Sequence, residues 1–284
     1  MQAESTSGRP CAGRSTVTKP PPATPLASGY AYGDNPLALQ RLLLLAKVFA
    51  PCSEEFLGRL PLREPSVVLD LGCGPGETTR LLFERFPRAQ TIGIDSSPEL
   101  VGAAVAGQPR AIAFVVGDVT RAPLSGSPAD PIYARLLLAH LRKPTEVVAN
   151  WRKQLRPGGV LALEEVERIL TDDQLFQEYL HLATSALRAR GTELFVGPTL
   201  QQMTPPAGTE MTSAVRTLQP SSQEAATMFA LNLDTLRQDQ SIKASYSQHQ
   251  LDAIAEALGA RAKDTDGPPI AWEVRQVILV RSGS

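Results

Sequence analysis

Three glycines and one aspartate form the residue pattern best suited to chemistry in this sequence. Gly72, Gly74 and Gly76 stand in the run VVLDLGCGPG at 67–76, and Asp70 precedes the first glycine by two residues. Because glycine has no Cβ, the backbone can approach a ligand closely and adopt positive φ angles. A helix that begins directly after such a loop also points its free N–H groups at the ligand. The run therefore predicts a ligand-binding loop.

The glycine spacing separates two classes of cofactor. Dinucleotide-binding loops read GxGxxG, with the third glycine one position later than it is here. The acid at position 70 suits a ligand with an ammonium group and would repel a pyrophosphate. The loop therefore favours a zwitterionic ligand over a dinucleotide.

The same run resembles motif I of class I S-adenosylmethionine-dependent methyltransferases, in the branch of quinone-biosynthesis and trans-aconitate-type enzymes. Similar segments follow in register over roughly residues 30–165: GDV at 117–119, IYARLLLAHL at 132–141 and LRPGG at 155–159. The resemblance implies S-adenosyl-L-methionine as the cofactor and methyl transfer as the reaction.

The resemblance also implies which residues bind that cofactor. Asp95, which lies 19 residues past Gly76, would bind both ribose hydroxyls, and Asp118 would face the adenine amine. Tyr30, chosen over Tyr32, would close over the methionine end. The expected cofactor-binding set is Tyr30, Asp70, Gly72, Cys73, Gly74, Asp95, Ser96, Asp118, Val119 and Arg135.

Several of these residues also have simpler structural interpretations. Asp70 and Asp95 can act as helix caps, and Asp118 as a turn residue. Arg135 can bind a carboxylate of the cofactor or substrate, or form a surface ion pair. Cys73 is interpreted as a small loop residue that contributes backbone contacts and not as a nucleophile.

Methyl transfer from a sulfonium needs neither a metal nor a covalent nucleophile, and a general base helps only a weakly acidic acceptor. The candidate bases are His140, after the fourth predicted strand, and Glu165, at the end of the fifth. Alternation along a strand implies that only one of Glu164 and Glu165 faces the ligand, and Glu165 is the choice. His140 can instead be a helix-start histidine with a local hydrogen bond, and a reaction without a base also fits.

Short apolar runs that alternate with amphipathic segments must position these residues. The alternation predicts an α/β fold, a Rossmann-like three-layer sandwich with a mostly parallel seven-stranded sheet and an antiparallel last strand. Right-handed crossovers place the strand carboxyl ends on one edge, where ligands of such sheets bind. Strands are expected at 67–69, 91–94, 113–116, 132–134, 160–163, 212–218 and 273–280.

Proline and capping residues delimit the expected helices. Pro51 should end the first helix, and Ser53 should cap a short one after it. Capping-box patterns begin at Thr171, Ser221 and Ser247. Helices are expected at 36–50, 78–86, 144–155, 172–190, 222–238 and 248–258.

These elements divide the chain into three parts. Residues 1–28, rich in Pro, Ser and Thr, are expected to be a disordered tail. Residues 29–65 should form an N-terminal helical lid. Residues 66–284 should form the methyltransferase domain, with helical insertions at about 171–205 and 221–260.

The bulk properties favour a small-molecule enzyme of the cytoplasm. A formal net charge of −1 over 284 residues gives no polyanion-binding character, so no nucleic-acid partner is expected. The three cysteines lack CxxC spacing, so neither a metal site nor a disulfide framework is predicted. No apolar run of about 20 residues was recognised, so no membrane insertion is expected. The sequence carries no indication of oligomeric state.

The predicted function is methyl transfer by in-line displacement to a small, lipophilic metabolite or natural product of secondary metabolism. The Asn-Pro-Pro-Tyr pattern of enzymes that methylate DNA amines or protein glutamine is absent after the fourth strand. Two alternatives stay open: an enzyme acting on a peptide, protein or RNA, and a non-catalytic cofactor-binding regulator. Most of the apolar helix residues should be core and some should line an apolar pocket; they are Leu175, Phe176, Tyr179, Met228, Phe229 and Leu231.

Overall fold

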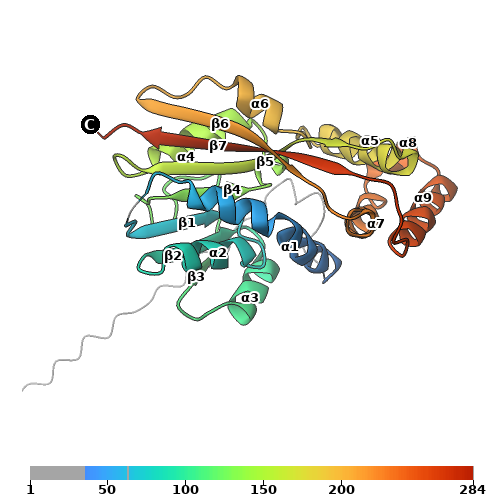
Figure 1. The fold of residues 1–284 in the computed structure, drawn as a ribbon, viewed down its shortest axis with the longest axis horizontal. Helices are drawn as coiled ribbons and strands as arrows, with labels where there is room; N and C mark the ends of the chain where they lie inside the picture. The colour runs from blue at the N-terminus through green and yellow to red at the C-terminus, as the bar shows by residue number, and fades with distance from the viewer. Residues whose placement is uncertain (1–35, 63, 284) are drawn as a thin grey trace, which may run out of the picture.

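The computed structural model describes residues 36–62 and 64–283 (Figure 1). The expected tail at 1–28 and the expected cofactor contact Tyr30 lie outside the described residues. Within the described part, helices lie on both faces of one central sheet, and a further group of helices lies beyond one end of it.

The sheet has seven strands in the order β3-β2-β1-β4-β5-β7-β6. Its strands β1 to β5 pair in parallel, and β7 is antiparallel to both of its neighbours, so β7 alone runs against the rest. This arrangement confirms the predicted Rossmann-like fold class. The strands are β1 (Val67–Leu71), β2 (Gln90–Asp95), β3 (Ala113–Val116), β4 (Ile132–Arg135), β5 (Val160–Leu170), β6 (Thr209–Leu218) and β7 (Ala271–Arg281).

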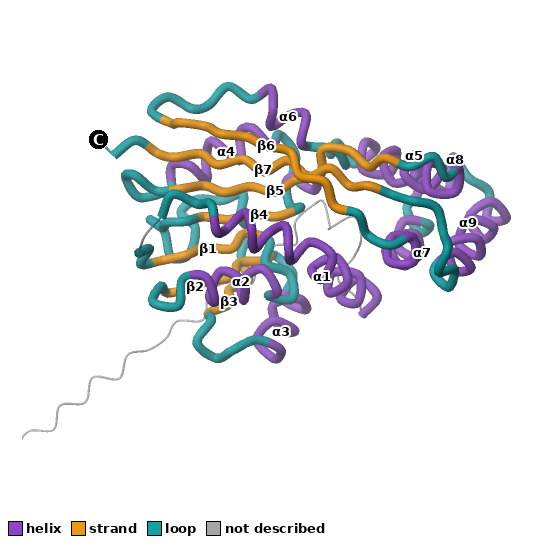
Figure 2. The backbone as a smooth tube through the Cα atoms, viewed as in Figure 1, coloured by secondary structure: helices purple, strands orange, loops and turns teal. Residues whose placement is uncertain are grey.

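The helices complete the layers, as Figure 2 shows. They are α1 (Pro36–Gly58), α2 (Glu77–Arg85), α3 (Pro98–Gly107), the 3-10 helix η1 (Leu138–His140), α4 (Pro144–Lys153), α5 (Gln174–Ala189), α6 (Gly197–Gln202), α7 (Ser222–Leu236), α8 (Gln240–Ser245) and α9 (Gln248–Arg261).

Three apolar cores hold the layers together. Phe56 of α1 and Leu82 of α2 pack on one face of the sheet, and Trp151 of α4 and Leu200 of α6 pack on the other. A third core joins α5, α7 and α9 around Phe229, beyond the carboxyl ends of the central strands. Because β5 and β7 are long enough to reach this third core, they connect the helical group to the sheet.

The predicted end of the first helix at Pro51 is wrong, since α1 continues through it to Gly58. A proline inside a helix costs one hydrogen bond and about 3 kcal/mol. Pro51 itself is exposed, but Phe49, Phe56 and Leu57 on the same helix are fully buried, and this packing outweighs the cost. Ser53 is buried inside the helix and does not cap it.

The capping boxes at Ser221 and Ser247 are confirmed, and the one at Thr171 is wrong. The side chain of Asp173 caps α5 instead, by accepting the backbone N–H of Phe176. The short helices α6 and α8 were not predicted, and α9 runs on to Arg261 rather than ending at residue 258.

Helix α1 is long and apolar enough, by length and composition alone, to cross a membrane. Charged residues such as Arg41 and Lys47 interrupt its apolar run, so the sequence alone does not indicate this property. A core helix can have the same length and composition, and Phe49 and Phe56 of α1 are buried against the rest of the chain.

Candidate functional site

A cavity of about 880 Å³ lies at the carboxyl edge of the sheet. Two groups of lining residues define its ends. The donor end is formed by residues 72–75, 95–98 and 116–121, in the loops after β1, β2 and β3. The acceptor end is formed by residues from β5, α5, the loop after α5, α7 and β7: Ile169, Tyr179, Leu180, Leu194, Phe229, Asn232 and Trp272.

The structure brings most of the predicted site residues to this cavity. The residues of the predicted set that line it are Gly72, Cys73, Gly74, Asp95, Ser96, Asp118, Val119, Arg135, His140 and Glu165. Asp70 is not among its lining residues, and Tyr30 lies outside the described part of the chain.

The glycine loop has the backbone that its sequence predicts. Gly72, Gly74 and Gly76 have φ angles of 67°, 52° and 87°, in the region that side chains other than glycine rarely adopt. A Cβ at Gly72 would lie 2.7 Å from the side chain of Leu137. Glycine at position 72 therefore permits both the turn and the close approach of the next loop.

Asp95 connects the glycine loop to the second strand. Its Oδ2 accepts the backbone N–H of Gly74 at 2.9 Å, and its Oδ1 accepts the backbone N–H of Ser97 at 2.9 Å. A carboxylate oxygen can accept two hydrogen bonds. These two bonds thus hold the carboxylate in place at the cavity wall.

Asp70 is buried next to the glycine loop and does not line the cavity. Its Oδ2 accepts the hydroxyls of Thr78 and Thr79 at 2.5 and 2.6 Å, which fastens the start of α2 to β1. Burial raises the pKa of this carboxyl to about 6, against the opposing effect of the two hydroxyls. The described contacts therefore give Asp70 a positioning role under the loop.

Asp118 combines a turn with a place on the cavity wall. Its Oδ1 accepts the backbone N–H and the hydroxyl of Thr120, at 2.9 and 2.6 Å, and its Oδ2 pairs with Arg121 at 3.0 Å. The carbonyl of Val119 accepts the indole N–H of Trp151 at 2.7 Å. This hydrogen bond attaches the loop after β3 to α4.

Arg135 lies at the end of β4 and lines the cavity rather than the outer surface. Its Nη1 donates to the Ser53 hydroxyl at 3.0 Å, and its guanidinium lies 5.8 Å from the ring centroid of Phe49. The charge of Arg135 also lowers the pKa of the buried Asp70 carboxyl, against the effect of burial.

Glu165 is almost fully buried, with 1% of its surface exposed. Its Oε1 accepts the backbone N–H groups of Leu137 and Leu138 at 2.9 and 2.7 Å, which holds the turn after β4. Its Oε2 has no hydrogen-bond partner among the described residues. Burial raises the pKa of this carboxyl to about 8, although the backbone hydrogen bonds oppose the shift.

His140 lies at the end of η1 and lines the same cavity. Burial lowers its pKa to about 3, and the nearby charges of Arg41 and Arg190 act in the same direction. The imidazole is therefore neutral at physiological pH.

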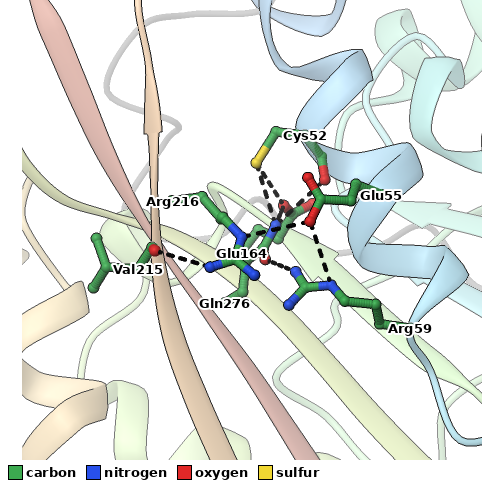
Figure 3. Close-up of polar contacts among 7 residues, drawn as sticks. All are labelled: Cys52, Glu55, Arg59, Glu164, Val215, Arg216 and Gln276. Carbon is green, nitrogen blue, oxygen red and sulfur yellow. Dashed lines mark hydrogen bonds and ion pairs between the residues drawn. The ribbon is translucent and has the colours of Figure 1, made fainter.

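Glu164 occupies the opposite face of β5, as strand alternation requires. It is completely buried and accepts hydrogen bonds from the Tyr133 hydroxyl and from Nε2 of Gln276, the latter at 2.7 Å. Figure 3 shows Cys52 of α1 directed at the same carboxylate. Burial, reinforced by the charge of Glu164, raises the pKa of the Cys52 thiol to about 11, so the thiol stays protonated.

The same close-up shows how α1 is fastened to the sheet. Glu55 of α1 pairs with Arg59 of the same helix and with Arg216 of β6, at 3.8 and 3.6 Å. Arg59 also donates to Oε1 of Gln276. Helix α1 is thus tied to β5, β6 and β7 at one end, while its other end contributes Arg41 to the cavity.

Sequence reasoning missed several cavity residues. Arg41 is a charged residue in an apolar helix and is only 5% exposed, a combination that could have marked it. Asn232 and Trp272 carried no such signal, because each stands in a run that reads as ordinary helix or strand. In the described part of the chain, no cluster of three or more His, Cys, Asp or Glu residues is placed to hold a metal ion.

Comparison with known proteins finds a methyltransferase domain in this chain. The family described as a methyltransferase domain matches residues 69–163. A trans-aconitate 2-methyltransferase from Azoarcus sp. is 36% identical over 125 residues, which are 44% of this chain and 49% of that protein. One from Methylobacterium radiotolerans is 41% identical over 110 residues, 39% of this chain and 42% of that protein. The matches thus span less than half of the length of these two relatives.

Solved structures share the fold at low sequence identity. The YcgJ protein from Bacillus subtilis superposes with a TM-score of 0.54 at 17% identity, covering 81% of this chain and 99% of that one. The cyclopropane synthase MmaA2 from Mycobacterium tuberculosis gives 0.51 at 20% identity, covering 84% of both chains.

The sheet order and the glycine loop together define a Rossmann-like protein with a cavity at the carboxyl edge of the sheet. Residues 69–163 match the methyltransferase domain family, and the trans-aconitate relatives are S-adenosylmethionine-dependent methyltransferases to which part of this chain is similar. S-adenosylmethionine is the cofactor of this family.

Proposed function

We propose that this chain transfers the methyl group of S-adenosylmethionine to a small, largely apolar molecule. The observation that carries the proposal is that one cavity joins the glycine loop and Asp95 to an apolar end beyond the sheet. A volume of about 880 Å³ lies at the upper end of the range typical of ligand sites, about 300–1,000 Å³. Both a cofactor and a second small molecule have room there.

The donor end fits the cofactor. Asp95 places a carboxylate at the cavity wall, where it can accept ribose hydroxyls, and Gly74 brings backbone without a side chain to the same wall. Asp118 lies at the wall where an adenine amine would be met, and Arg135 supplies a cation for the methionine carboxylate. When bound, S-adenosylmethionine supplies an activated methyl group on a sulfonium sulfur.

The acceptor end orients the second molecule and excludes water. Its walls are mainly aliphatic and aromatic side chains, among them Tyr179 and Phe229, which are each only 2% exposed. Holding two reactants in line can contribute about 7–11 kcal/mol to lowering a barrier. Positioning is thus the main contribution that we assign to the protein.

Where the acceptor must lose a proton, Glu165 is the better candidate base. Its pKa of about 8 is near the working pH that an efficient general base requires, and its Oε2 has no described partner. His140, with a pKa of about 3, is a weak base even though its imidazole is neutral. We therefore assign proton acceptance to Glu165 and a neutral wall position to His140.

A second candidate is methylation of a carboxylate, the activity that the names of the trans-aconitate relatives suggest. The arginines Arg41 and Arg135 favour it, because both line the cavity and can bind carboxylates. A carboxylate acceptor is already ionised and needs no general base. For this candidate function, Glu165 would therefore not act as a base.

The test is methyl transfer by the full-length chain from labelled S-adenosylmethionine. Two acceptor sets would be offered side by side: neutral hydroxylated ring compounds, and trans-aconitate. We expect label in the neutral set, and label in trans-aconitate alone would favour the second candidate. Failure to bind S-adenosylmethionine by calorimetry would contradict both.

A further inference from the structure

Two buried polar atoms at the acceptor end lack hydrogen-bond partners within residues 36–62 and 64–283. They are Oδ1 of Asn232, on α7, and Nε1 of Trp272, on β7. The indole is only 5% exposed. An unpaired buried polar atom is unfavourable for folding, so a native structure rarely keeps two at one cavity wall without a use.

Aromatic packing holds both atoms in one cluster. The ring of Phe229 stacks on Tyr179 with centroids 4.2 Å apart and on Trp272 with centroids 6.1 Å apart. The Tyr179 hydroxyl accepts Nδ2 of Asn232 at 2.8 Å. That bond orients the Asn232 amide, so that its Oδ1 is the atom without a hydrogen-bond partner. The stacking on Phe229 fixes the orientation of the indole.

The chemistry of the two atoms describes a ligand. An amide oxygen accepts a hydrogen bond and an indole N–H donates one. The ligand must therefore present one donor and one acceptor. The surrounding wall of Ile169, Leu180 and Leu194 carries no charge, and burying an unpaired charge against it would be costly.

We propose that the acceptor end binds a neutral ring compound that carries a hydroxyl and a carbonyl. The hydroxyl donates to Oδ1 of Asn232, and the carbonyl accepts from Nε1 of Trp272. This assignment rests on the proposed methyltransferase function and names the class of its acceptor. The assignment disfavours a tricarboxylate at this end. An ionised carboxylate only accepts hydrogen bonds, and Oδ1 of Asn232 is itself an uncharged acceptor.

The experiment is calorimetry on the full-length chain saturated with S-adenosylhomocysteine. The probes are 6-hydroxyflavone, which has both groups, flavone, which lacks the hydroxyl, and 6-hydroxyflavan, which lacks the carbonyl. We expect 6-hydroxyflavone to bind about tenfold more tightly than either of the other two. Trans-aconitate should bind more weakly than all three.

Two variants assign each group to its partner. In Asn232→Leu, hydroxyflavone and flavone should bind equally, and in Trp272→Phe, hydroxyflavone and hydroxyflavan should bind equally. Because the comparison is made between ligands within one variant, a general loss of affinity does not obscure it. Glu210→Ala, an exposed change on β6, is the control and should keep the tenfold preferences.

Three results would overturn the assignment: equal binding of the three flavonoids to the unaltered chain, no binding of any of them, or tighter binding of trans-aconitate. S-adenosylhomocysteine is titrated first on each preparation. If it binds and the flavonoids fail, the acceptor class is wrong and the methyltransferase proposal stands. If it does not bind, the proposed function itself fails.

Discussion

Gly74 donates its backbone N–H to Oδ2 of Asp95 across 2.9 Å, so the loop after the first strand is tied to the end of the second. The loop therefore has a fixed shape before any ligand arrives. A carboxylate oriented in this way loses little freedom when it accepts ribose hydroxyls, because the protein has already ordered it.

Asp95→Ala should weaken S-adenosylmethionine binding about 100-fold. The variant loses two charge-assisted hydrogen bonds to the ligand, each worth about 1.5–3 kcal/mol, although part of this is offset by water. Calorimetry measures the affinity, and Glu210→Ala serves as the matched acid-to-alanine control on the exposed face of β6. Affinity within threefold of the unaltered chain would contradict the ribose assignment.

Glu165→Gln should lower turnover on a hydroxyl acceptor at least 100-fold and abolish the pH dependence near 8. The amide can still accept the N–H groups of Leu137 and Leu138, so the turn is kept while the titrating group is lost. In the unaltered chain, turnover should rise with pH through about 8 as the carboxyl loses its proton. An unchanged pH profile in the variant would remove Glu165 as the base.

The same substitution should alter the pH dependence of stability. Burial raises the pKa of Glu165 from 4.5 to about 8 in the folded chain, so the folded state holds a proton that the unfolded state releases. The stabilisation from this group is therefore complete below pH 4.5 and is lost as the pH rises to 8. Urea unfolding at pH 5 and pH 8 should show the unaltered chain losing stability relative to Glu165→Gln. A constant difference between the two pH values would contradict the shift.

His140→Gln should reduce turnover less than tenfold and leave the cofactor affinity unchanged. An imidazole with a pKa of about 3 contributes little as a base at neutral pH. Initial rates at saturating S-adenosylmethionine measure the effect. A loss as large as that of Glu165→Gln would return His140 to the list of catalytic residues.

Pro51→Ala should stabilise the chain by about 1 kcal/mol. Alanine restores a helical N–H that proline lacks, and the greater entropy of its unfolded chain removes part of the gain. Pro51 is exposed in the middle of α1, so no buried packing is lost. The midpoint of urea unfolding measures the change, and a destabilised variant would show that α1 depends on the proline.

The central strands could be predicted closely because both faces of a parallel sheet are buried, which makes their sequences continuous apolar runs. The fifth strand was predicted to end at residue 163 because Glu164 and Glu165 interrupt the run. Each carboxyl accepts a hydrogen bond from a residue distant in sequence, Gln276 for the first and Leu137 for the second, and no local pattern reveals such partners.

The donor end was predicted better than the acceptor end for a related reason. The glycines and Asp95 lie within one local motif of fixed spacing, so the chemistry can be inferred from adjacent residues. Asn232 and Trp272 are 40 positions apart and line the same cavity only because Phe229 of α7 packs on Trp272 of β7. A pattern read along the chain cannot detect such a pairing.

The residues that form the two ends of the cavity come mainly from different segments of the sequence. The matched methyltransferase segment ends at residue 163, and every acceptor-end residue, from Ile169 to Trp272, comes later. Similarity to a named relative is therefore informative about the cofactor and says little about the acceptor of the methyl group. We expect that replacing residues 164–284 with the corresponding segment of a relative would change the acceptor that is bound, while the glycine loop and Asp95 stay unchanged.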